Sequence, residues 1–342
     1  MSNSYKNFTS ADVATTKTLL HEVIPLTGTI VSGTYSDANI KNYTHGMFQS
    51  VYDYPYLSSS ANHIFDISVG YSATSALSNS ANTLNSKKIN IYNQMAQILV
   101  GFDTGSTIQK FDQDGDLSSG NKLNECIFVS FSRLLSKDEI KKGSFTVSLY
   151  GGGTNSSPSG LLTIGDYGAA TDYRTNSPAG EFGILYTSSV ASAGTGVGLL
   201  YYQAGIMVLT ASLFSTSFGP RSDSSTYTGS VSSYLSSGSI SGSCDGFRNR
   251  LDNIQFNNTT ELNSSIYFCR ANHNEFNYSS NPTYLSNGKI VVKNMSTDAP
   301  VAYITTVGLY SADNELLAVA KLSEPLKKSV DNELTIRTRL DF

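Results

Sequence analysis

The C-terminal run from Ser265 to Phe342 reads SIYFCRANHNEFNYSSNPTYLSNGKIVVKNMSTDAPVAYITTVGLYSADNELLAVAKLSEPLKKSVDNELTIRTRLDF. Short segments rich in Val, Ile, Thr, Tyr and Phe alternate with the turn signals Asn281-Pro282, Asn287-Gly288 and Ala312-Asp313-Asn314. Apolar segments of this length, separated by such turns, are typical of an antiparallel sheet. The run therefore predicts a small β-module, and it offers almost nothing that could catalyse a reaction.

The rest of the chain continues this pattern. In 63–71, Phe65, Ile67 and Val69 alternate with Ile64, Asp66 and Ser68, which predicts a half-buried strand. Further strands are expected at 19–26, 27–34, 126–131 and 144–150. We therefore predict a mainly β fold of antiparallel, sandwich-like sheets.

Two helices are expected within this β framework. The main one lies near 86–100, where Ile89, Tyr92, Met95, Ala96 and Leu99 form a single apolar stripe. Ser86 can cap its start and Gly101 can end it. A short helix is expected near 137–142, because Ser136 and Glu139 have the spacing of a capping box.

Composition divides the chain into three regions. Residues 1–150 are β-rich and contain the main helix, 151–265 are rich in Gly and Ser and expected to be loop-like, and 266–342 form the C-terminal β-module. The triglycine 151–153 is expected to act as a hinge. The C-terminal module is expected to be able to pack with the N-terminal region as one core.

Only 15% of the 342 residues are charged, and the chain has 21 Tyr and 16 Phe but no Trp. Few charges mean little repulsion between copies, so this composition fits a protein that lies against other protein molecules. It fits an ordinary β-rich protein equally well. The net charge of −4 and the lack of a Lys/Arg run argue against a direct nucleic-acid ligand.

Cys126, Cys244 and Cys269 are an odd number with no CxxC pair, which argues against a disulfide framework and a zinc site. The N-terminus lacks a charged-then-apolar leader, so we expect folding in a reducing cytosol. The uncharged run 198–214 is close to the lower limit for a membrane span. Because it contains Gln203, we expect two buried strands meeting near Gly205, without membrane insertion.

Asp112, Asp114 and Asp116 form the one cluster that resembles a cation site. Three carboxylates at alternate positions could converge on Ca²⁺ if the loop curls. The EF-hand pattern fails, because Gly115 is fourth in the loop and Leu123 is twelfth. We favour an ordinary acidic turn, and the sequence leaves cation binding open.

No catalytic constellation is recognisable, so we expect no enzyme, no catalytic residue and no cofactor. The sequence contains no nucleophile elbow, phosphate-binding loop or dinucleotide fingerprint. Glu261, Glu275, Asp313 and Glu315 could be paired as glycosidase carboxylates, but so could many others. The histidines are scattered, and we expect them to be solvated or structural: His21, His45, His63 and His273.

An aromatic–Asn strip runs from Tyr267 to Tyr284. Its rings could stack on sugars while Asn side chains bind hydroxyl groups, as in a receptor-binding face. The alternative is that Phe268, Phe276 and Tyr278 are core residues and that the Asn side chains hold turns. We favour the second interpretation.

Three blocks of the chain resemble virion structural proteins of contractile-tailed, cyanophage-like bacteriophages. They are 88–102 continued by 111–149, then 180–214, and the C-terminal module with its phrases NEFNYSSNPTY at 274–284 and ITTVGLYSADNELLAVAKLS at 304–323. The resemblance implies a structural role and carries no ligand or catalytic residues with it.

From this resemblance we expect a structural component of a tailed-phage virion, folded in the host cytoplasm and located in the particle. A tail baseplate or tail-associated adaptor is the first expectation, with a neck or head–tail junction protein and a receptor- or glycan-binding tail module as alternatives. The expected partners are copies of the chain and other virion proteins. Because 332–342 alternates and ends on an aromatic ring, we expect Phe342 to be buried in a core or a subunit contact.

Overall fold

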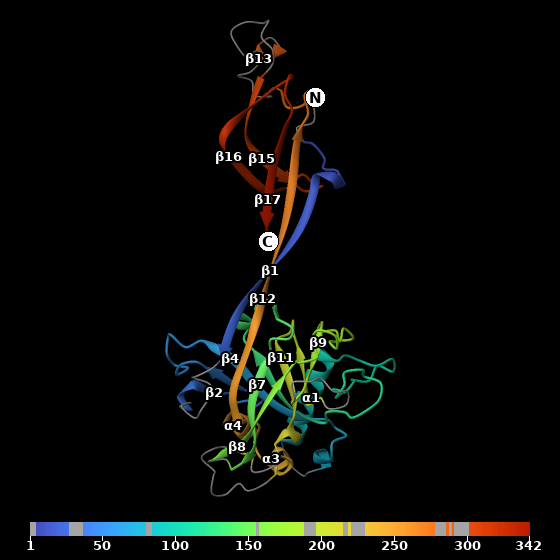
Figure 1. Ribbon diagram of the computed structural model, residues 1–342, viewed down its shortest axis with the longest axis vertical. Coiled ribbons are helices and arrows are strands. Elements are labelled where there is room, and N and C mark those ends of the chain that lie inside the picture. The colour runs from blue at the N-terminus through green and yellow to red at the C-terminus, as the bar shows by residue number, and fades with distance from the viewer. Residues whose placement is uncertain are drawn as a thin grey trace. The chain divides into compact units, whose positions relative to one another are not determined.

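The computed structural model describes residues 5–26, 37–79, 84–154, 157–187, 196–214, 218–219, 230–277, 285–286, 289–290 and 301–342. The fold is mainly β, with antiparallel sheets and few helices, as predicted (Figure 1). The chain forms two compact units. We call residues 20–260 the central unit, and residues 1–19 with 261–342 the terminal unit. The boundary expected at 150 lies inside the central unit, and the terminal unit contains both ends of the chain.

The strands are β1 Val13–Leu26, β2 Ile40–Asn42, β3 Gln49–Tyr52, β4 His63–Tyr71, β5 Glu125–Phe131, β6 Glu139–Ile140, β7 Thr146–Gly153, β8 Pro158–Gly165, β9 Phe182–Leu185, β10 Gly198–Tyr201, β11 Ile206–Thr210, β12 Leu251–Ala271, β13 Leu285–Ser286, β14 Lys289–Ile290, β15 Val301–Tyr310, β16 Leu316–Ser329 and β17 Leu334–Asp341. The α-helices are α1 Asn85–Leu99, α2 Arg133–Ser136, α3 Val231–Ser237 and α4 Ile240–Arg250. Short 3-10 helices are η1 Ser10–Asp12, η2 Asp37–Asn39, η3 Ala76–Asn79 and η4 Ala211–Leu213.

A seven-stranded antiparallel sheet organises the central unit, in the order β2-β3-β4-β5-β11-β10-β9. Its middle strands are strongly apolar, and β4 pairs with β5 from Phe65↔Phe131 to Tyr71↔Glu125. Helices α1 and α4 pack against β4, so this strand is buried more completely than the half-buried strand that its alternation predicts. The close approach of α1 depends on Gly70, where an added Cβ would lie 2.6 Å from the carbonyl oxygen of Lys88.

A second sheet faces the first one across the core of the central unit. Here β7 pairs with β8 and with the first part of β12, while β6 pairs with β12 at Asn258 and Thr259. The rings of Phe131 in β5 and Phe256 in β12 lie 5.2 Å apart, and Phe145 packs 5.8 Å from Phe131. These aromatic contacts join the two sheets into the predicted sandwich-like arrangement.

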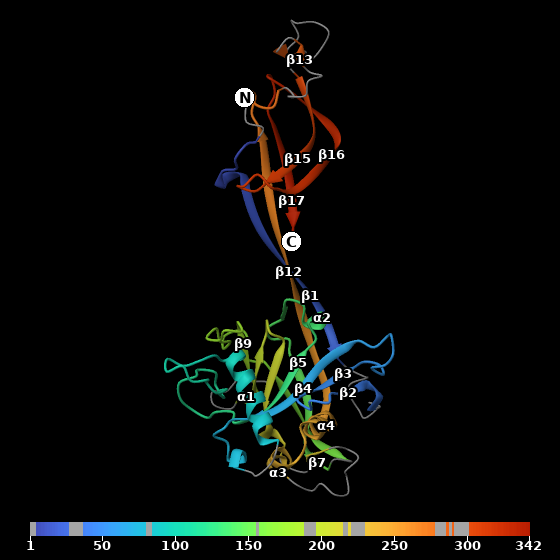
Figure 2. The ribbon, with the colours of Figure 1, turned by 180° about the vertical axis from the view of Figure 1, so that it is seen from behind.

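The terminal unit is built from a few long strands. The second part of β12 pairs with β17 from Ser264↔Asp341 to Ala271↔Leu334. β15 and β16 form a separate antiparallel hairpin, with register shifts near Ile304 and Tyr310. Figure 2 shows both strand pairs from behind.

The main helix and the apolar hairpin form as predicted, but the prediction that Ser86 caps the helix is wrong, because Ser86 lies inside α1 and Leu84 precedes its first residue. α1 occupies 85–99, and Gly101 follows it with a φ of 92°, donating its amide to the carbonyl of Ala96. The run 198–214 contains β10 and β11, which pair across a turn at Gly205. Among the described residues, the structure contains no helix that is long and apolar enough to cross a membrane.

The prediction of a short helix near 137–142 is wrong. The helical turn α2 ends at Ser136, and Lys137 has a φ of 55°, which interrupts any continuation. Glu139 and Ile140 instead form β6, because they pair with Thr259 and Asn258 of β12. Pairing with β12 therefore prevails over the local capping signal.

The serine-dense segment before 243 was expected to be loop-like, and its described part is helical. Ser230 and Ser239 accept hydrogen bonds from the amides of Ser233 and Gly242, so they cap α3 and α4. Val231, Tyr234 and Leu235 are buried on α3. The triglycine 151–153 is also not a hinge, because all three residues belong to β7. The strand expected at 27–34 lies outside the described residues.

Candidate functional site

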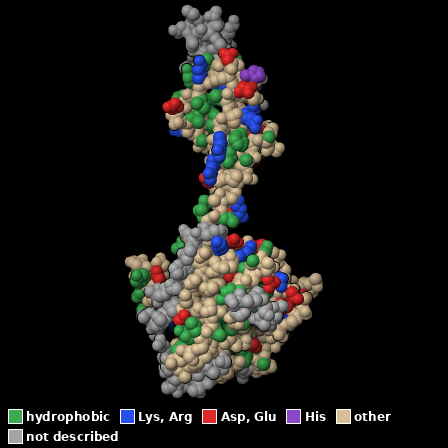
Figure 3. All heavy atoms as spheres, in the orientation of Figure 1, with side chains coloured by type: hydrophobic (Ala, Val, Ile, Leu, Met, Phe, Trp, Pro, Cys, Tyr) green, Lys and Arg blue, Asp and Glu red, His purple; other side chains and the backbone are tan. Residues whose placement is uncertain are grey.

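The terminal unit exposes most of its large apolar side chains. Among its described residues, fourteen large apolar side chains are exposed, whereas only Ala271, Val301 and Leu309 are buried apolar residues. On the face shown in Figure 3, apolar side chains of this unit lie between charged ones. The exposed set is Tyr5, Phe8, Leu19, Leu262, Phe276, Tyr303, Tyr310, Leu316, Leu317, Val319, Leu326, Val330, Leu340 and Phe342.

The hairpin strand β16 explains why so little of this unit is buried. Its residues alternate between exposed and half-buried from Leu317 to Ser323, and Leu317 is 68% exposed. In the described part of the chain β16 pairs only with β15. A two-stranded sheet is by itself only marginally stable in water. We call the exposed apolar residues of β16 and β17 the strand surface.

Polar contacts hold the terminal unit together in place of an apolar core. Lys328 is fully buried, and its Nζ donates to the Asn277 Oδ1 at 2.6 Å and to the carbonyl of Ser329 at 2.7 Å. Arg270 Nε lies 2.8 Å from Asp12 Oδ1. These contacts fix the strands and leave the apolar side chains at the surface.

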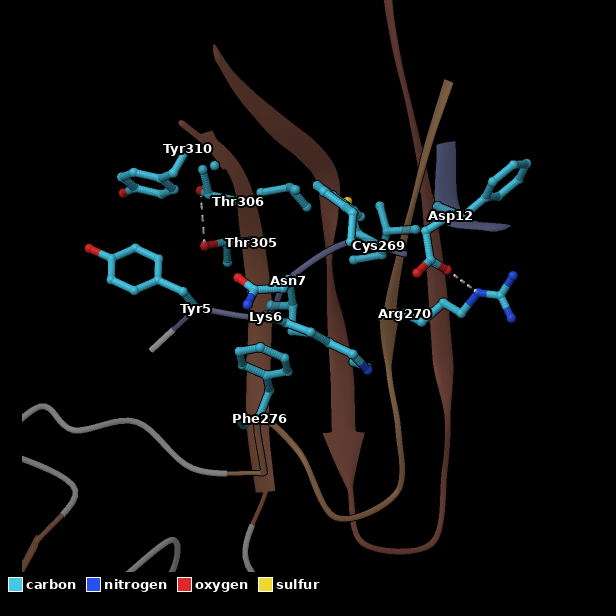
Figure 4. A pocket seen from close by; sticks show the side chains of 18 of the residues that line it. Tyr5, Lys6, Asn7, Asp12, Cys269, Arg270, Phe276, Thr305, Thr306 and Tyr310 are labelled. Atoms are coloured by element: carbon cyan, nitrogen blue, oxygen red, sulfur yellow. Dashed lines mark hydrogen bonds and ion pairs between the residues drawn. The ribbon is translucent and has the colours of Figure 1, made fainter. Parts of the chain in front are cut away.

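A pocket of about 450 Å³ lies within the terminal unit (Figure 4). Tyr5 and Tyr310 meet edge to face at its border, with ring centroids 4.9 Å apart. Phe276, which is 41% exposed, adds a third ring. Thr305 and Thr306, which lie on β15 together with Tyr310, add hydroxyl groups to the lining. The pocket thus combines aromatic faces with polar groups, a combination that suits a small polar ligand.

The aromatic–Asn strip contributes to this pocket only in part. Phe268 is half-buried and Phe276 is exposed, so the expectation that they are core residues is wrong. The expected turn role of the Asn residues holds at Asn277, which donates from Nδ2 to the carbonyl of His273 at 2.8 Å. Tyr278 and Tyr284 lie outside the described residues.

Phe342 is not a core residue. Its backbone pairs with Asn263 through two hydrogen bonds of 2.9 and 3.0 Å, but its side chain is 70% exposed. The strand end is therefore fixed while the ring remains available. The expected burial in a subunit contact stays a prediction.

Two of the described histidines, His63 and His273, lie beside carboxylates. His63 Nε2 lies 2.8 Å from Asp66 Oδ1, and the hydroxyl of Ser50 donates to the same carboxylate oxygen. The aspartate thus lies between the histidine and the serine, so the imidazole cannot accept the serine proton directly. His273 lies 3.3 Å from Glu333, and the side chain of His21 is not described.

The candidate carboxylates differ in their surroundings. Glu261 and Glu275 form ion pairs with Lys17 at 2.5 Å and Lys6 at 2.6 Å. The oxygens of Asp112, Asp114 and Asp116, in contrast, lie within 4.8 Å of one another. The structure therefore brings together the one cluster that the sequence singled out.

The sequence pattern does not reveal several buried ionisable residues, and Lys88 and Asp166 are two examples. Lys88 is fully buried on α1 and donates to the carbonyls of Leu235 at 2.5 Å and Gly238 at 2.8 Å, at the end of α3. Asp166 accepts hydrogen bonds from the amides of Gly143 and Phe145 and from the hydroxyl of Tyr202. Both groups satisfy backbone atoms of the fold, so they are structural. No local pattern around either residue predicts these partners.

Comparison with protein-family models, curated proteins and solved structures finds no match to this chain.

Proposed function

We propose that this chain is a non-enzymatic structural component of a tailed-phage virion, and that its terminal unit binds a second copy of the chain. The observation that carries the proposal is the exposure of the strand surface on a unit of about one hundred residues with three buried apolar side chains among those described. A domain of this size normally buries well over half of the surface of its unfolded chain. The apolar surface that stays exposed in the single chain is available to a partner.

The amount of exposed apolar surface suits a stable interface. Fourteen large side chains, each roughly half exposed, leave on the order of 1,000 Å² of apolar surface on the terminal unit. Specific interfaces bury about 800 Å² on each partner. Unpaired strand edges such as that of β16 can also add a strand from a neighbour.

A second copy is the partner that the charge distribution favours. The chain has few charges, so identical surfaces repel one another weakly. Closed symmetric oligomers are also the commonest assemblies of soluble chains. The resemblance of three sequence blocks to virion structural proteins supports a place in the particle. A baseplate or tail-associated adaptor is the first choice, and the neck is the alternative.

The pocket of the terminal unit favours a second candidate function, a receptor- or glycan-binding tail module. Tyr5, Tyr310 and Phe276 could stack on a sugar ring while Thr305 and Thr306 bind its hydroxyl groups. Binding of the full chain to a glycan array, lost on Tyr310→Ala, would support this function. An array without signal would leave assembly as the function to pursue.

Sedimentation velocity of the full chain over a dilution series tests the assembly proposal. We expect a concentration-dependent oligomer that Leu317→Glu dissociates, because a charge on β16 would be desolvated at the interface. The matched control is Leu57→Glu, which places the same charge at a residue of the central unit that is 85% exposed. A wild-type monomer at all concentrations, or equal effects of both variants, would refute the proposal.

A further inference from the structure

The connection between α1 and β5 contains a closed loop that presents three carboxylates to one point. Asp112 and Lys122 form an antiparallel bridge, and the amides of Leu123 and Gln113 donate to the carbonyls of Phe111 and Asn121. Within this loop, one oxygen from each of Asp112, Asp114 and Asp116 lies within 4.8 Å of the other two. The backbone therefore gathers side chains that alternate in sequence.

Asp112 gives an independent indication of a ligand. Its side chain is fully buried, and its Oδ2 accepts hydrogen bonds from Lys122 Nζ at 2.8 Å and from the amide of Leu117 at 2.9 Å. Its Oδ1 is also buried and has no hydrogen-bond partner. A buried carboxylate oxygen without a partner is costly, because it has lost its hydration without compensation. Oδ1 is thus the oxygen that remains for a ligand.

The other two carboxylates are held beside Asp112 by the loop itself. Asp116 Oδ1 accepts the amide of Ser118 at 2.8 Å, and its Oδ2 accepts the hydroxyl of Ser118 at 3.0 Å. Asp114 Oδ1 accepts the amide of Asp116 at 3.3 Å. Their orientation therefore comes from contacts within the loop.

The loop is also fixed from outside by a neighbouring segment. Arg174 donates from Nε and Nη2 to the carbonyl of Asp114 at 3.3 Å, and Asn176 donates to the carbonyl of Gly115 at 3.1 Å. Because these bonds use backbone oxygens, they leave the three carboxylates available. The site is preorganised for a ligand that needs only oxygen donors.

The net negative charge of the loop favours binding of a cation. Three carboxylates and the Lys122 ammonium leave two formal negative charges in a partly buried place. A divalent cation would neutralise the remaining charge.

We propose that Asp112, Asp114 and Asp116 form a calcium site, in which Asp112 Oδ1 and one oxygen from each of the other aspartates bind the ion. Calcium takes oxygen ligands at about 2.3–2.6 Å, so a single ion can reach three oxygens that lie within 4.8 Å of one another. Magnesium requires shorter distances and a near-ideal octahedron. Bound calcium would join the loop to the buried Asp112 and stabilise the connection to β5.

The competing explanation is a proton shared between Asp112 and Asp116, which would satisfy the same buried oxygen without a metal. The two explanations differ in their response to added calcium. Isothermal titration of the full chain with calcium chloride, and separately with magnesium chloride, therefore tests the proposal. We expect one calcium site per chain, weaker binding of magnesium, and a higher midpoint of thermal unfolding with calcium.

Asp114→Asn is the test variant, because its amide oxygen can still accept the amide of Asp116 and the fold should persist. We expect it to weaken calcium binding about tenfold or more, since one ligand charge is lost. Asp103→Asn is the matched control: Asp103 is exposed in the same connection and holds its own turn by accepting the amides of Gly105 and Thr107. It should bind calcium as the wild type does.

Three results would overturn the proposal. If millimolar calcium gives neither heat nor a thermal shift, the shared proton accounts for the cluster. If Asp114→Asn binds calcium with unchanged affinity, the ion binds elsewhere. If magnesium binds as tightly as calcium, the assignment to calcium is wrong. Circular dichroism of each variant shows whether the fold is retained.

Discussion

Removal of the Phe342 ring should weaken self-association while leaving the fold of the chain intact. The ring is 70% exposed, so about 140 Å² of its roughly 200 Å² is available to a partner. At about 25 cal/mol per Å², full burial of this area would contribute about 3.5 kcal/mol for each ring. For each ring that the interface buries, Phe342→Ala should then raise the dissociation constant by up to a few hundred-fold, and by about twentyfold if half of the area is buried.

The same variant should cost the folded chain little. The part of the ring that is already buried is about 60 Å², which corresponds to at most about 1.5 kcal/mol. The two backbone hydrogen bonds between Phe342 and Asn263 do not involve the side chain, so β17 should keep its pairing. Urea unfolding followed by circular dichroism measures this effect separately from association.

Sedimentation velocity over a dilution series provides the dissociation constants. The matched control is Leu57→Ala, which removes an 85% exposed apolar side chain from the central unit and should leave association unchanged. Self-association through the Phe342 ring is refuted if Phe342→Ala associates as tightly as the wild type. It is also refuted if Leu57→Ala weakens association to the same extent, since the effect would then not depend on the terminal unit.

Two further predictions concern the central unit. Burial raises the pKa of Asp166 from 3.8 to about 6, so the folded chain holds a proton between about pH 4 and pH 6 that the unfolded chain has released. The free energy of unfolding should therefore fall as the pH rises through 6, by about 3 kcal/mol at neutral pH, and urea titrations should show no such slope for Asp166→Asn. Gly70→Ala should lower the free energy of unfolding by about 1–3 kcal/mol or more, because the new methyl group would lie 2.6 Å from the Lys88 carbonyl oxygen and push α1 away from β4. Gly152→Ala, whose nearest contact would be an ordinary 3.5 Å, should have a much smaller effect in the same assay.

The strands of the central sheet could be predicted because their apolar patterns are local. His63–Tyr71 was predicted with the observed bounds of β4, and the uncharged run 198–214 folds as a hairpin around Gly205. Strands in the middle of a sheet show such patterns because burial on both faces requires nearly continuous apolar residues. The alternation in 63–71 predicts only half-burial, whereas β4 is almost fully buried because α1 and α4 cover it.

The errors arose where long-range contacts decide the structure. The capping signal at Ser136 was overridden by pairing of Ile140 with β12, which lies more than one hundred residues later. In the serine-rich segment, Ser230 and Ser239 act as helix caps, and the apolar spacing of Val231, Tyr234 and Leu235 was the signal that could have revealed α3.

The terminal unit shows what sequence patterns leave open. The alternation in 316–329 and 334–341 predicts strands, and both strands form. Alternation normally implies one face packed on a core, but Leu317 and Phe342 face solvent in the single chain. For the candidate cation site, the spacing of the three aspartates was visible, but the buried oxygen of Asp112 was not.

Immunogold electron microscopy tests directly whether this chain is a structural component of a virion. An antibody raised against this chain would be applied to intact, purified phage particles from a culture in which the chain is expressed. We expect gold labels at the tail or the neck, with several labels at the same position because the chain would be present in multiple copies. Absence of the chain from purified particles, by labelling and by sensitive detection of the protein, would contradict a role in the virion.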